Sequence, residues 1–278
     1  MNMFNFLHSY QPDPVLFSWQ GLTVHWYGFF IVAGIILGTI TAIILAKYHR
    51  VSKEVILDLV FWLVLGGIIG ARLYHVLLQF SYYSNNPWQI LKIWEGGLAI
   101  HGAILGGIIV LLLFARFSTG LSGNTKKNFW LLASLVAPAL ALAQAVGRWG
   151  NYFNQELFGK PTDLSWGIPI QLLNRPMEYM NHEFFHPTFL YESLGNLIIF
   201  LSLIGIHIWI IKKHKRNYEV VVAAYLILYS ILRFGMEFLR IDPTPVFFGL
   251  RTPQIASIIL IVLAILLTIP PIKRKITE

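Results

Sequence analysis

The chain has 278 residues, of which 56% are hydrophobic and only 12% are charged. Soluble domains average about 25% charged residues, so this composition excludes an ordinary soluble fold and indicates an integral membrane protein. A net charge of +8 is compatible with nucleic-acid binding in principle, but the basic residues occur in short clusters between apolar segments, which argues against it. The chain has no cysteine, so it offers no disulfide, thiolate metal site or cysteine nucleophile.

Seven apolar segments are long enough to cross a membrane as helices, because about 30 Å of hydrocarbon takes about 20 helical residues. These predicted spans are residues 23–46, 55–80, 98–117, 128–147, 188–211, 218–239 and 252–270. The alternation typical of membrane strands is lacking, which argues against a barrel. The sequence therefore predicts an all-α membrane protein whose residues 1–278 form a single membrane domain.

Basic residues are concentrated in alternate connections. Thirteen of the 21 Lys and Arg residues follow the first, third, fifth and seventh spans. The positive-inside rule then places the N-terminus outside and the C-terminus in the cytoplasm. Residues 1–22 contain neither Lys nor Arg, so we expect no signal peptide there and predict an arm on the outer surface. The long connection 148–187 is rich in Gly and Pro and falls on the same side, where we expect an ordered, functional head region.

Glycines recur four residues apart in three of the predicted spans. The pairs are Gly34 and Gly38, Gly66 and Gly70, and Gly102 and Gly106. Small residues at this spacing let membrane helices approach closely, so helix packing is the simplest interpretation.

Two polar residues near the outer ends of spans are candidates for proton transfer. His101 is flanked by Gly96, Gly97 and Gly102, which leave room for another molecule, and an imidazole can accept a proton near neutral pH. The alternative, of equal weight, is a histidine satisfied within the core. Tyr27 opens the first span, where its ring either anchors the helix at the interface or turns its hydroxyl into a polar cavity.

Arg72 and His75 lie three residues apart on one face of the second span. A charged side chain within the bilayer costs about 2.5–3.5 kcal/mol and therefore requires a partner. We expect a carboxylate on another helix to pair with them. A purely structural polar clamp is at least as well supported as a catalytic role.

A dense group of polar side chains follows the fourth span. Arg148, Asn151, Asn154 and Glu156 lie within nine residues, in what the pattern predicts to be a loop. The planar guanidinium of Arg148 suits phosphate, and lipid head groups supply phosphate at a membrane surface. Solvated loop residues are the alternative, but the density of polar groups favours a site.

Charged residues also mark the outer ends of the fifth and sixth spans. Glu192 lies about one turn into the fifth span and needs a donor, for which the arginines are the candidates. Arg233, Glu237 and Arg240 form a stripe of alternating charge at the end of the sixth. An intrahelical salt bridge with snorkelling ends explains Arg240 equally well, whereas the deeper Arg233 favours a polar cavity.

Together these segments resemble the prolipoprotein diacylglyceryl transferases of bacterial inner membranes over nearly the whole chain. The most specific motif is Gly147-Arg148-x-Gly150-Asn151-x-x-Asn154-x-Glu156-x-x-Gly159. The others are His25-Trp26-Tyr27-Gly28, Gly96-Gly97 with His101-Gly102, His186-Pro187-Thr188-x-Leu190-Tyr191-Glu192, Arg233-Phe234-x-x-Glu237-Phe238-x-Arg240, and Gln254. Phe189 departs from the pattern, because many members carry a polar residue there.

The resemblance implies an enzyme of the bacterial cytoplasmic (inner) membrane with seven helices, an outer head region, and no metal or cofactor. Its implied reaction moves the diacylglyceryl group of phosphatidylglycerol to the lipobox cysteine thiol of a prelipoprotein, forming a thioether and releasing glycerol phosphate. The implied catalytic residues are His101 as base, Tyr27 as its helper or rival, and Arg233. The implied substrate-binding residues are Arg148, which clamps phosphate together with Arg233, Asn151 and Asn154 for glycerol or ester oxygens, and Glu156, Glu237 and Arg240 around the arginines.

Three other functions fit the sequence less well. A transporter would show paired broken helices and polar groups spread across the membrane, whereas here they concentrate toward the outer side. A metal-dependent head-group phosphotransferase would need clustered aspartates, and the four present are dispersed. An intramembrane serine protease would need surroundings like Gly-x-Ser-x-Gly, which the sequence lacks.

Overall fold

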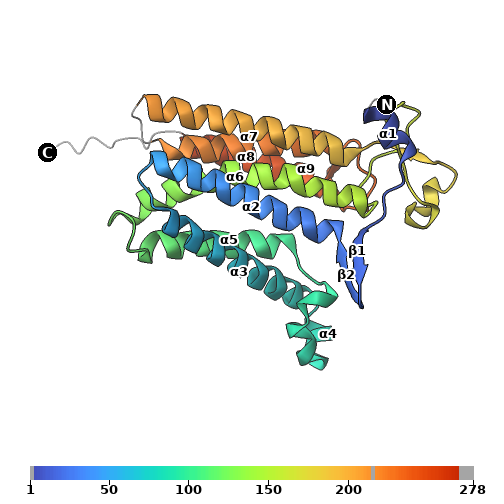
Figure 1. Cartoon of the computed structure of the whole chain (residues 1–278), viewed down its shortest axis with the longest axis horizontal. Coiled ribbons are helices and arrows are strands. Elements are labelled where there is room, and N and C mark those ends of the chain that lie inside the picture. The colour runs from blue at the N-terminus through green and yellow to red at the C-terminus, as the bar shows by residue number, and fades with distance from the viewer. Residues whose placement is uncertain (1–2, 214–216, 269–278) are drawn as a thin grey trace. The chain divides into compact units, whose positions relative to one another are not determined.

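The computed structural model describes residues 3–213 and 217–268, and helices dominate these residues (Figure 1). Six of the helices have the length and composition to cross a membrane: α2 (Trp26–Tyr48), α3 (Lys53–Leu78), α5 (Ile100–Phe117), α6 (Thr125–Phe153), α7 (Thr188–Lys212) and α8 (Tyr218–Met236). The prediction of an all-α membrane protein is thereby confirmed. The seventh apolar segment forms the shorter helix α9 (Thr252–Thr268), and the last two residues of the predicted span 252–270 lie outside the described residues.

Two helix ends differ from the predicted spans in ways that matter for the site. Helix α6 continues to Phe153, so Arg148 and Asn151 lie on its last turns and the prediction of a loop there is wrong. The apolar pattern ends at the first charge, but the helix continues because its polar face is buried against other protein groups. Helix α8 ends at Met236, so Arg240 lies beyond it in an irregular segment.

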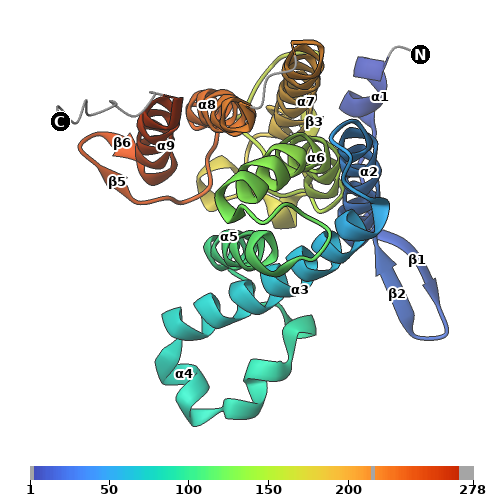
Figure 2. The ribbon, with the colours of Figure 1, turned by 90° about the vertical axis from the view of Figure 1, so that its left-hand side faces the viewer.

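The backbone divides into two compact units. The first comprises the described residues up to Thr41 and from Val136 onward, and the second comprises Ala42–Leu135. In the first unit, α8 lies between α7 and α9 (Figure 2). Its apolar core joins Ala137 and Ala141 of α6 to Leu203 of α7 and Val221 of α8, all of which are buried. Gly34 and Gly38 let α2 pack on α6, since a Cβ at either would lie 3.0–3.1 Å from a carbonyl oxygen of that helix.

The remaining elements of the first unit lie next to the ends of these helices. They are α1 (Met3–Ser9), the hairpin of β1 (Val15–Trp19) and β2 (Leu22–His25), the paired strands β3 (Ile168–Pro169) and β4 (Phe184–Phe185), the 3-10 turns η3 (Leu172–Asn174) and η4 (Met177–Tyr179), and the hairpin of β5 (Val246–Phe247) and β6 (Leu250–Arg251). Between α6 and α7, a second apolar core of buried residues including Phe158, Ile170 and Phe185 holds the region in place. Leu7 of α1 belongs to that core, and His8 binds the carbonyl oxygen of Gly167 at 2.8 Å.

The second unit is built on α3 packed against α5. In the chain, these two helices are joined by α4 (Phe80–Asn85) and the 3-10 turns η1 (Pro87–Leu91) and η2 (Ile93–Glu95). Gly66 and Gly70 of α3 face Gly102 and Gly106 of α5 so closely that an added Cβ at Gly102 would overlap the carbonyl oxygen of Gly70. The glycine spacing therefore serves helix packing, as the simplest interpretation held.

Replacing Gly102 with alanine is expected to lower the melting temperature of the purified protein, because the new methyl group forces α3 and α5 apart at a cost of about 1–3 kcal/mol. Gly107→Ala on the same helix is the matched control, since its Cβ would come no closer than 4.0 Å to its nearest neighbour, Leu63. Thermal unfolding in detergent measures both. Equal melting temperatures for the two variants would contradict close packing at Gly102.

Candidate functional site

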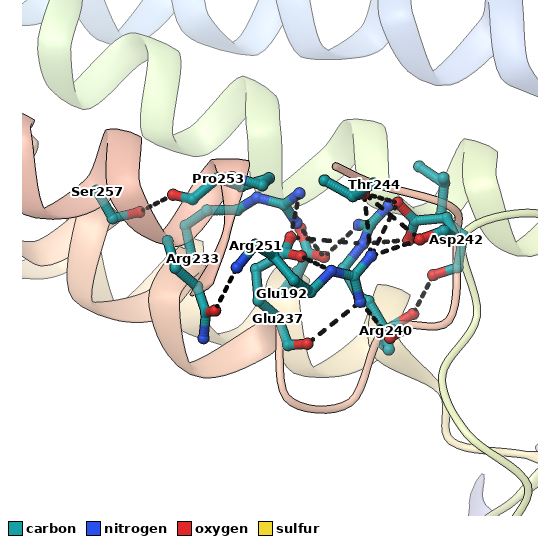
Figure 3. A network of polar contacts seen from close by, with 12 residues as sticks. Glu192, Arg233, Glu237, Arg240, Asp242, Thr244, Arg251, Pro253 and Ser257 are labelled. Carbon is teal, nitrogen blue, oxygen red and sulfur yellow. Dashed lines mark hydrogen bonds and ion pairs between the residues drawn. The ribbon is translucent and has the colours of Figure 1, made fainter. Parts of the chain in front are cut away.

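Charged side chains of the first unit converge where α6 and α8 end and α7 begins. The cluster consists of four arginines and three carboxylates: Arg148, Arg233, Arg240, Arg251, Glu192, Glu237 and Asp242. Figure 3 labels all of them except Arg148 and shows the labelled side chains converging from α7, α8 and the segment that follows α8. Four guanidinium groups against three carboxylates leave one positive charge in excess. We call this set the arginine cluster.

Glu192 connects three of the arginines. It lies in the second turn of α7 with 3% of its surface exposed. Its carboxylate oxygens lie 2.5 Å from Nη2 of Arg148, 3.1 Å from Nη1 of Arg240 and 3.9 Å from Nη1 of Arg233. A buried carboxylate is costly unless it is paired and hydrogen-bonded, and these contacts provide the pairing. The expectation that arginines supply the donor for Glu192 is confirmed.

Glu237 joins the cluster at the end of α8, and its side chain is fully buried. One of its oxygens lies 2.5 Å from Nη2 of Arg233, four residues earlier on the helix, and the other lies 2.8 Å from Nε of Arg251. Arg240 is more distant, with Nε 4.0 Å from the same carboxylate. The charge stripe along 233–240 thus forms contacts within itself, as its spacing predicted, and extends to Arg251 as well.

Arg240 is buried rather than snorkelling, with 5% of its surface exposed. Its Nε donates to Asp242 at 2.7 Å, and the backbone before it pairs with the region that follows α6, where the amide of Lys160 donates to the carbonyl of Leu239 at 2.8 Å. Gly159 allows this approach, since a Cβ there would lie 3.1 Å from the Leu239 oxygen. Burial raises the pKa of Asp242, but the hydrogen bond and charge of Arg240 and the charge of Arg251 outweigh it and hold the pKa below its usual value.

Arg148 reaches the cluster from α6 and also begins a polar chain along that helix. Its Nη1 donates to Oδ1 of Asn151 at 3.3 Å, and Nδ2 of Asn151 donates to Glu156 at 2.7 Å. Glu156 therefore acts on Arg148 through Asn151, and no direct ion pair joins Glu156 to an arginine among the described residues. Asn154 directly follows the helix, and its backbone N–H donates to the carbonyl of Gly150 at 3.0 Å.

Tyr27 packs beside this end of α6. A Cβ on Gly150 would lie 3.2 Å from Cα of Tyr27 and 2.9 Å from its ring, so only glycine allows α2 to come this close. Tyr27 is 39% exposed, which leaves part of its ring open beside the helical turn that carries Arg148 and Asn151. The structure therefore places Tyr27 next to the motif that begins with Gly147 and Arg148.

The remaining predicted residues belong to the second unit. His101 lies in the first turn of α5, is exposed, and has the ring of Tyr74 5.9 Å away, centroid to centroid. The expectation that Arg72 pairs with a carboxylate is wrong. Its guanidinium donates to the carbonyl oxygens of Gln89, Ile90, Lys92, Gly96 and Gly97, and so clamps the connection between α4 and α5. Five carbonyl dipoles solvate the cation in place of an acid, which is the structural role held as the alternative.

Arg251 and Asp242 are members of the cluster that the sequence did not single out. Arg251 lies on β6, outside the predicted spans, and follows a run of eight uncharged residues after Asp242. A lone arginine directly before an apolar segment was the available signal. Gln254, which the resemblance included, is 4% exposed and accepts from the amide of Arg251 at 3.0 Å.

Comparison with known proteins identifies relatives across almost the whole chain. A family model described as prolipoprotein diacylglyceryl transferase matches residues 14–270. A phosphatidylglycerol–prolipoprotein diacylglyceryl transferase of Acaryochloris marina is 44% identical over 248 residues, covering 89% of this chain and 86% of the relative. Proteins of the same name from Synechococcus elongatus and Nostoc sp. are 43% and 42% identical, covering 92% and 89% of this chain and 86% and 85% of the relatives.

Proposed function

Because this chain belongs to the prolipoprotein diacylglyceryl transferase family, we propose that it transfers the diacylglyceryl group of phosphatidylglycerol to the lipobox cysteine of prelipoproteins. The cysteine sulfur attacks the glyceryl carbon that bears the phosphodiester, and the bond from that carbon to oxygen breaks. A thioether forms, the thiol proton is removed, and glycerol phosphate leaves. The observation that carries this proposal is the arginine cluster, with its excess positive charge, at the ends of apolar helices.

The cluster suits the charge that this reaction develops. The phosphodiester carries one negative charge and the departing phosphomonoester carries more, so fixed cations at the phosphate stabilise the transition state more than the ground state. We propose Arg148 and Arg233 as the phosphate clamp. Nη1 of Arg233 is buried and has no hydrogen-bond partner among the described residues, whereas both Nη1 and Nη2 of Arg251 donate hydrogen bonds and its Nε is ion-paired with Glu237. A phosphate oxygen would supply the partner that Arg233 lacks.

The other residues take supporting roles in this proposal. Asn151 and Asn154, at the end of α6, bind the glycerol hydroxyls or ester oxygens. Glu237 and Arg240 hold the clamp from behind, and Glu156 orients Asn151, which its hydrogen bond to that amide supports.

The proposed topology has seven spans, with α9 as the last, in the bacterial cytoplasmic membrane. The N-terminus is outside and the C-terminus is cytoplasmic, which the distribution of Lys and Arg supports. The region between α6 and α7 forms the outer head, and the arginine cluster lies on the same outer side because it shares the ends of these helices. A substrate cysteine exported across the membrane would meet the cluster there.

One assay decides the proposed function. Purified protein in phosphatidylglycerol-containing detergent micelles is incubated with a lipobox peptide, and mass spectrometry follows the peptide while an enzymatic assay follows glycerol phosphate. We expect the peptide to gain one diacylglyceryl group for each glycerol phosphate released. A peptide with serine in place of cysteine is the control. Absence of both products would refute the proposed reaction.

We propose His101 as the base that removes the thiol proton, with Tyr27 as its helper or rival. His101→Gln should therefore lower the transfer rate by about 10²- to 10⁴-fold at neutral pH, because glutamine has the size but takes up no proton. A cysteine thiol ionises by itself at a pH of about 8.5 or above, so the difference in transfer rate between His101→Gln and the unmodified protein should become smaller in alkaline buffer. His182→Gln, an exposed histidine between α6 and α7, is the control. Equal rates for His101→Gln and the unmodified protein at every pH would remove His101 from this role and leave Tyr27 as the candidate.

A further inference from the structure

Arg251 is the member of the arginine cluster that comes from a hairpin strand, β6, whereas the other arginines come from α6, from α8 or from the segment directly after α8 (Figure 3). We infer that Arg251 is a positioning residue that keeps Arg233 available to the phosphate by holding the carboxylate of Glu237. The inference rests on the proposed function and goes beyond it, because it assigns a role to a residue outside the family motifs quoted above.

The contacts of Arg251 fix the chain where it leaves α8. Its Nη1 donates to the carbonyl oxygens of Arg240 at 2.5 Å and Glu237 at 3.4 Å, and its Nη2 donates to the carbonyl of Asp242 at 2.5 Å and to the hydroxyl of Thr244 at 3.0 Å. The carbonyl of Glu237 is at the C-terminus of α8, where carbonyl groups lack helical partners and carry partial negative charge, so a cation there is favourable. One guanidinium thereby holds the segment 237–244.

The same guanidinium determines how Glu237 meets Arg233. Arg251 Nε binds one carboxylate oxygen at 2.8 Å, and Arg233 Nη2 binds the other at 2.5 Å. A carboxylate facing a single arginine prefers to bind two of its nitrogens side by side. Without Arg251, Glu237 would be free to turn both oxygens toward Arg233 and occupy its Nη1. With Arg251 in place, Glu237 is shared and Nη1 of Arg233 has no hydrogen bond among the described residues.

Arg251 also contributes the excess charge of the cluster. With it, four guanidinium groups face three carboxylates; without it, the charges balance. A neutral cluster attracts a phosphodiester less strongly. Loss of Arg251 would thus weaken phosphate binding by Arg233 in two ways, through the geometry of Glu237 and through the electrostatic potential at the phosphate.

The hairpin holds Arg251 rigidly enough for this role. Phe248 and Gly249 both have positive φ, at 52° and 76°, the geometry of a tight two-residue turn that suits antiparallel strands. The amide of Arg251 donates to Gln254, and the amide of Thr252 donates to the carbonyl of Pro245 at 2.9 Å. The backbone at Arg251 and Thr252 is therefore held by two hydrogen bonds, one to the side chain of Gln254 and one to a main-chain carbonyl.

A double-mutant cycle with Arg233 tests the inference. Arg251→Gln should lower kcat by about tenfold or more in the transfer assay, since small displacements of a catalytic group have effects of this size. Arg233→Lys retains a charge but has a single nitrogen, so Glu237 has no second nitrogen to occupy. In that background Arg251→Gln should lower kcat by less than about threefold, because groups that act through one another are not additive.

Two further variants separate positioning from simple support of the fold. Arg251→Lys keeps the charge, but its single nitrogen cannot bind Glu237 and the backbone carbonyls together. Compared with Arg251→Gln, it should bring KM for phosphatidylglycerol back toward the value of the unmodified protein more than it does kcat. Arg175→Gln is the matched control, since Arg175 also donates to backbone carbonyls, those of Ile170 and Met180, and contacts no carboxylate among the described residues. It should leave kcat unchanged. If Arg251→Gln fails to fold, the cycle is run with Arg251→Lys.

The outcomes are distinct. Unchanged kcat for Arg251→Gln, or the same fold loss in both Arg233 backgrounds, would overturn the inference while the transfer reaction stands. Absence of transfer by the unmodified protein would overturn the proposed function itself.

Discussion

Arg233→Ala is expected to lower kcat/KM for transfer by about 10²- to 10³-fold, the range found when one fixed donor to developing charge is removed. The guanidinium lies between Glu192 and Glu237, with Nη2 held at 2.5 Å by Glu237 and Nη1 without a hydrogen bond among the described residues. Alanine removes both the charge and the donor that the phosphate would use. Initial rates at several phosphatidylglycerol concentrations measure the effect, and Arg148→Ala should give a loss of the same order.

The control for Arg233→Ala must keep a cation near the C-terminal end of α8 without the clamp geometry. Arg233→Lys does so. We expect its rate to lie between those of Arg233→Ala and the unmodified protein, because the single nitrogen of lysine must be shared between Glu237 and the phosphate. Both variants should remain in the membrane fraction with melting temperatures that allow the assay. An Arg233→Ala protein that transfers at the unmodified rate would show that the phosphate binds elsewhere.

Most of the fold was predictable because hydropathy is a local property of the sequence. The apolar segments became helices close to the predicted residues, and the glycine pairs of 66–70 and 102–106 became the contact of α3 with α5. The end of α6 was not predictable from hydropathy. Arg148 and Asn151 look like the start of a loop until the contacts of Arg148 with Glu192 and with Asn151 are known.

The candidate site was predictable in composition but not in connectivity. The need of Glu192 for a cation followed from its place in an apolar segment, yet the choice among arginines 41 to 48 residues away depends on tertiary structure. Arg72 was assigned the wrong kind of partner because backbone carbonyls carry no signature in the sequence. Arg251 was missed because strands of two residues show no periodicity.

Glu192→Gln is expected to destabilise the protein by about 3–5 kcal/mol, because it removes one partner from a buried set of charges. Glutamine preserves the size of the side chain, so the loss of stability measures the effect of removing the negative charge that Arg148 and Arg240 face at 2.5 and 3.1 Å. Thermal unfolding in detergent measures it, with Glu183→Gln, an exposed glutamate, as the control. Transfer activity should fall as well, since three arginines lose the group that orients them.

A second substitution determines whether the loss comes from uncompensated charge. Removing both members of a buried ion pair costs less than removing one, because no isolated charge remains. Arg240 is the partner to remove, since it is itself buried and adjoins Glu192. The double variant Glu192→Gln with Arg240→Gln should therefore melt at a higher temperature than Glu192→Gln alone, although it is expected to stay inactive. If the double variant melts at the lower temperature of the two, the cluster is held together by the individual hydrogen bonds and not by the balance of its charges.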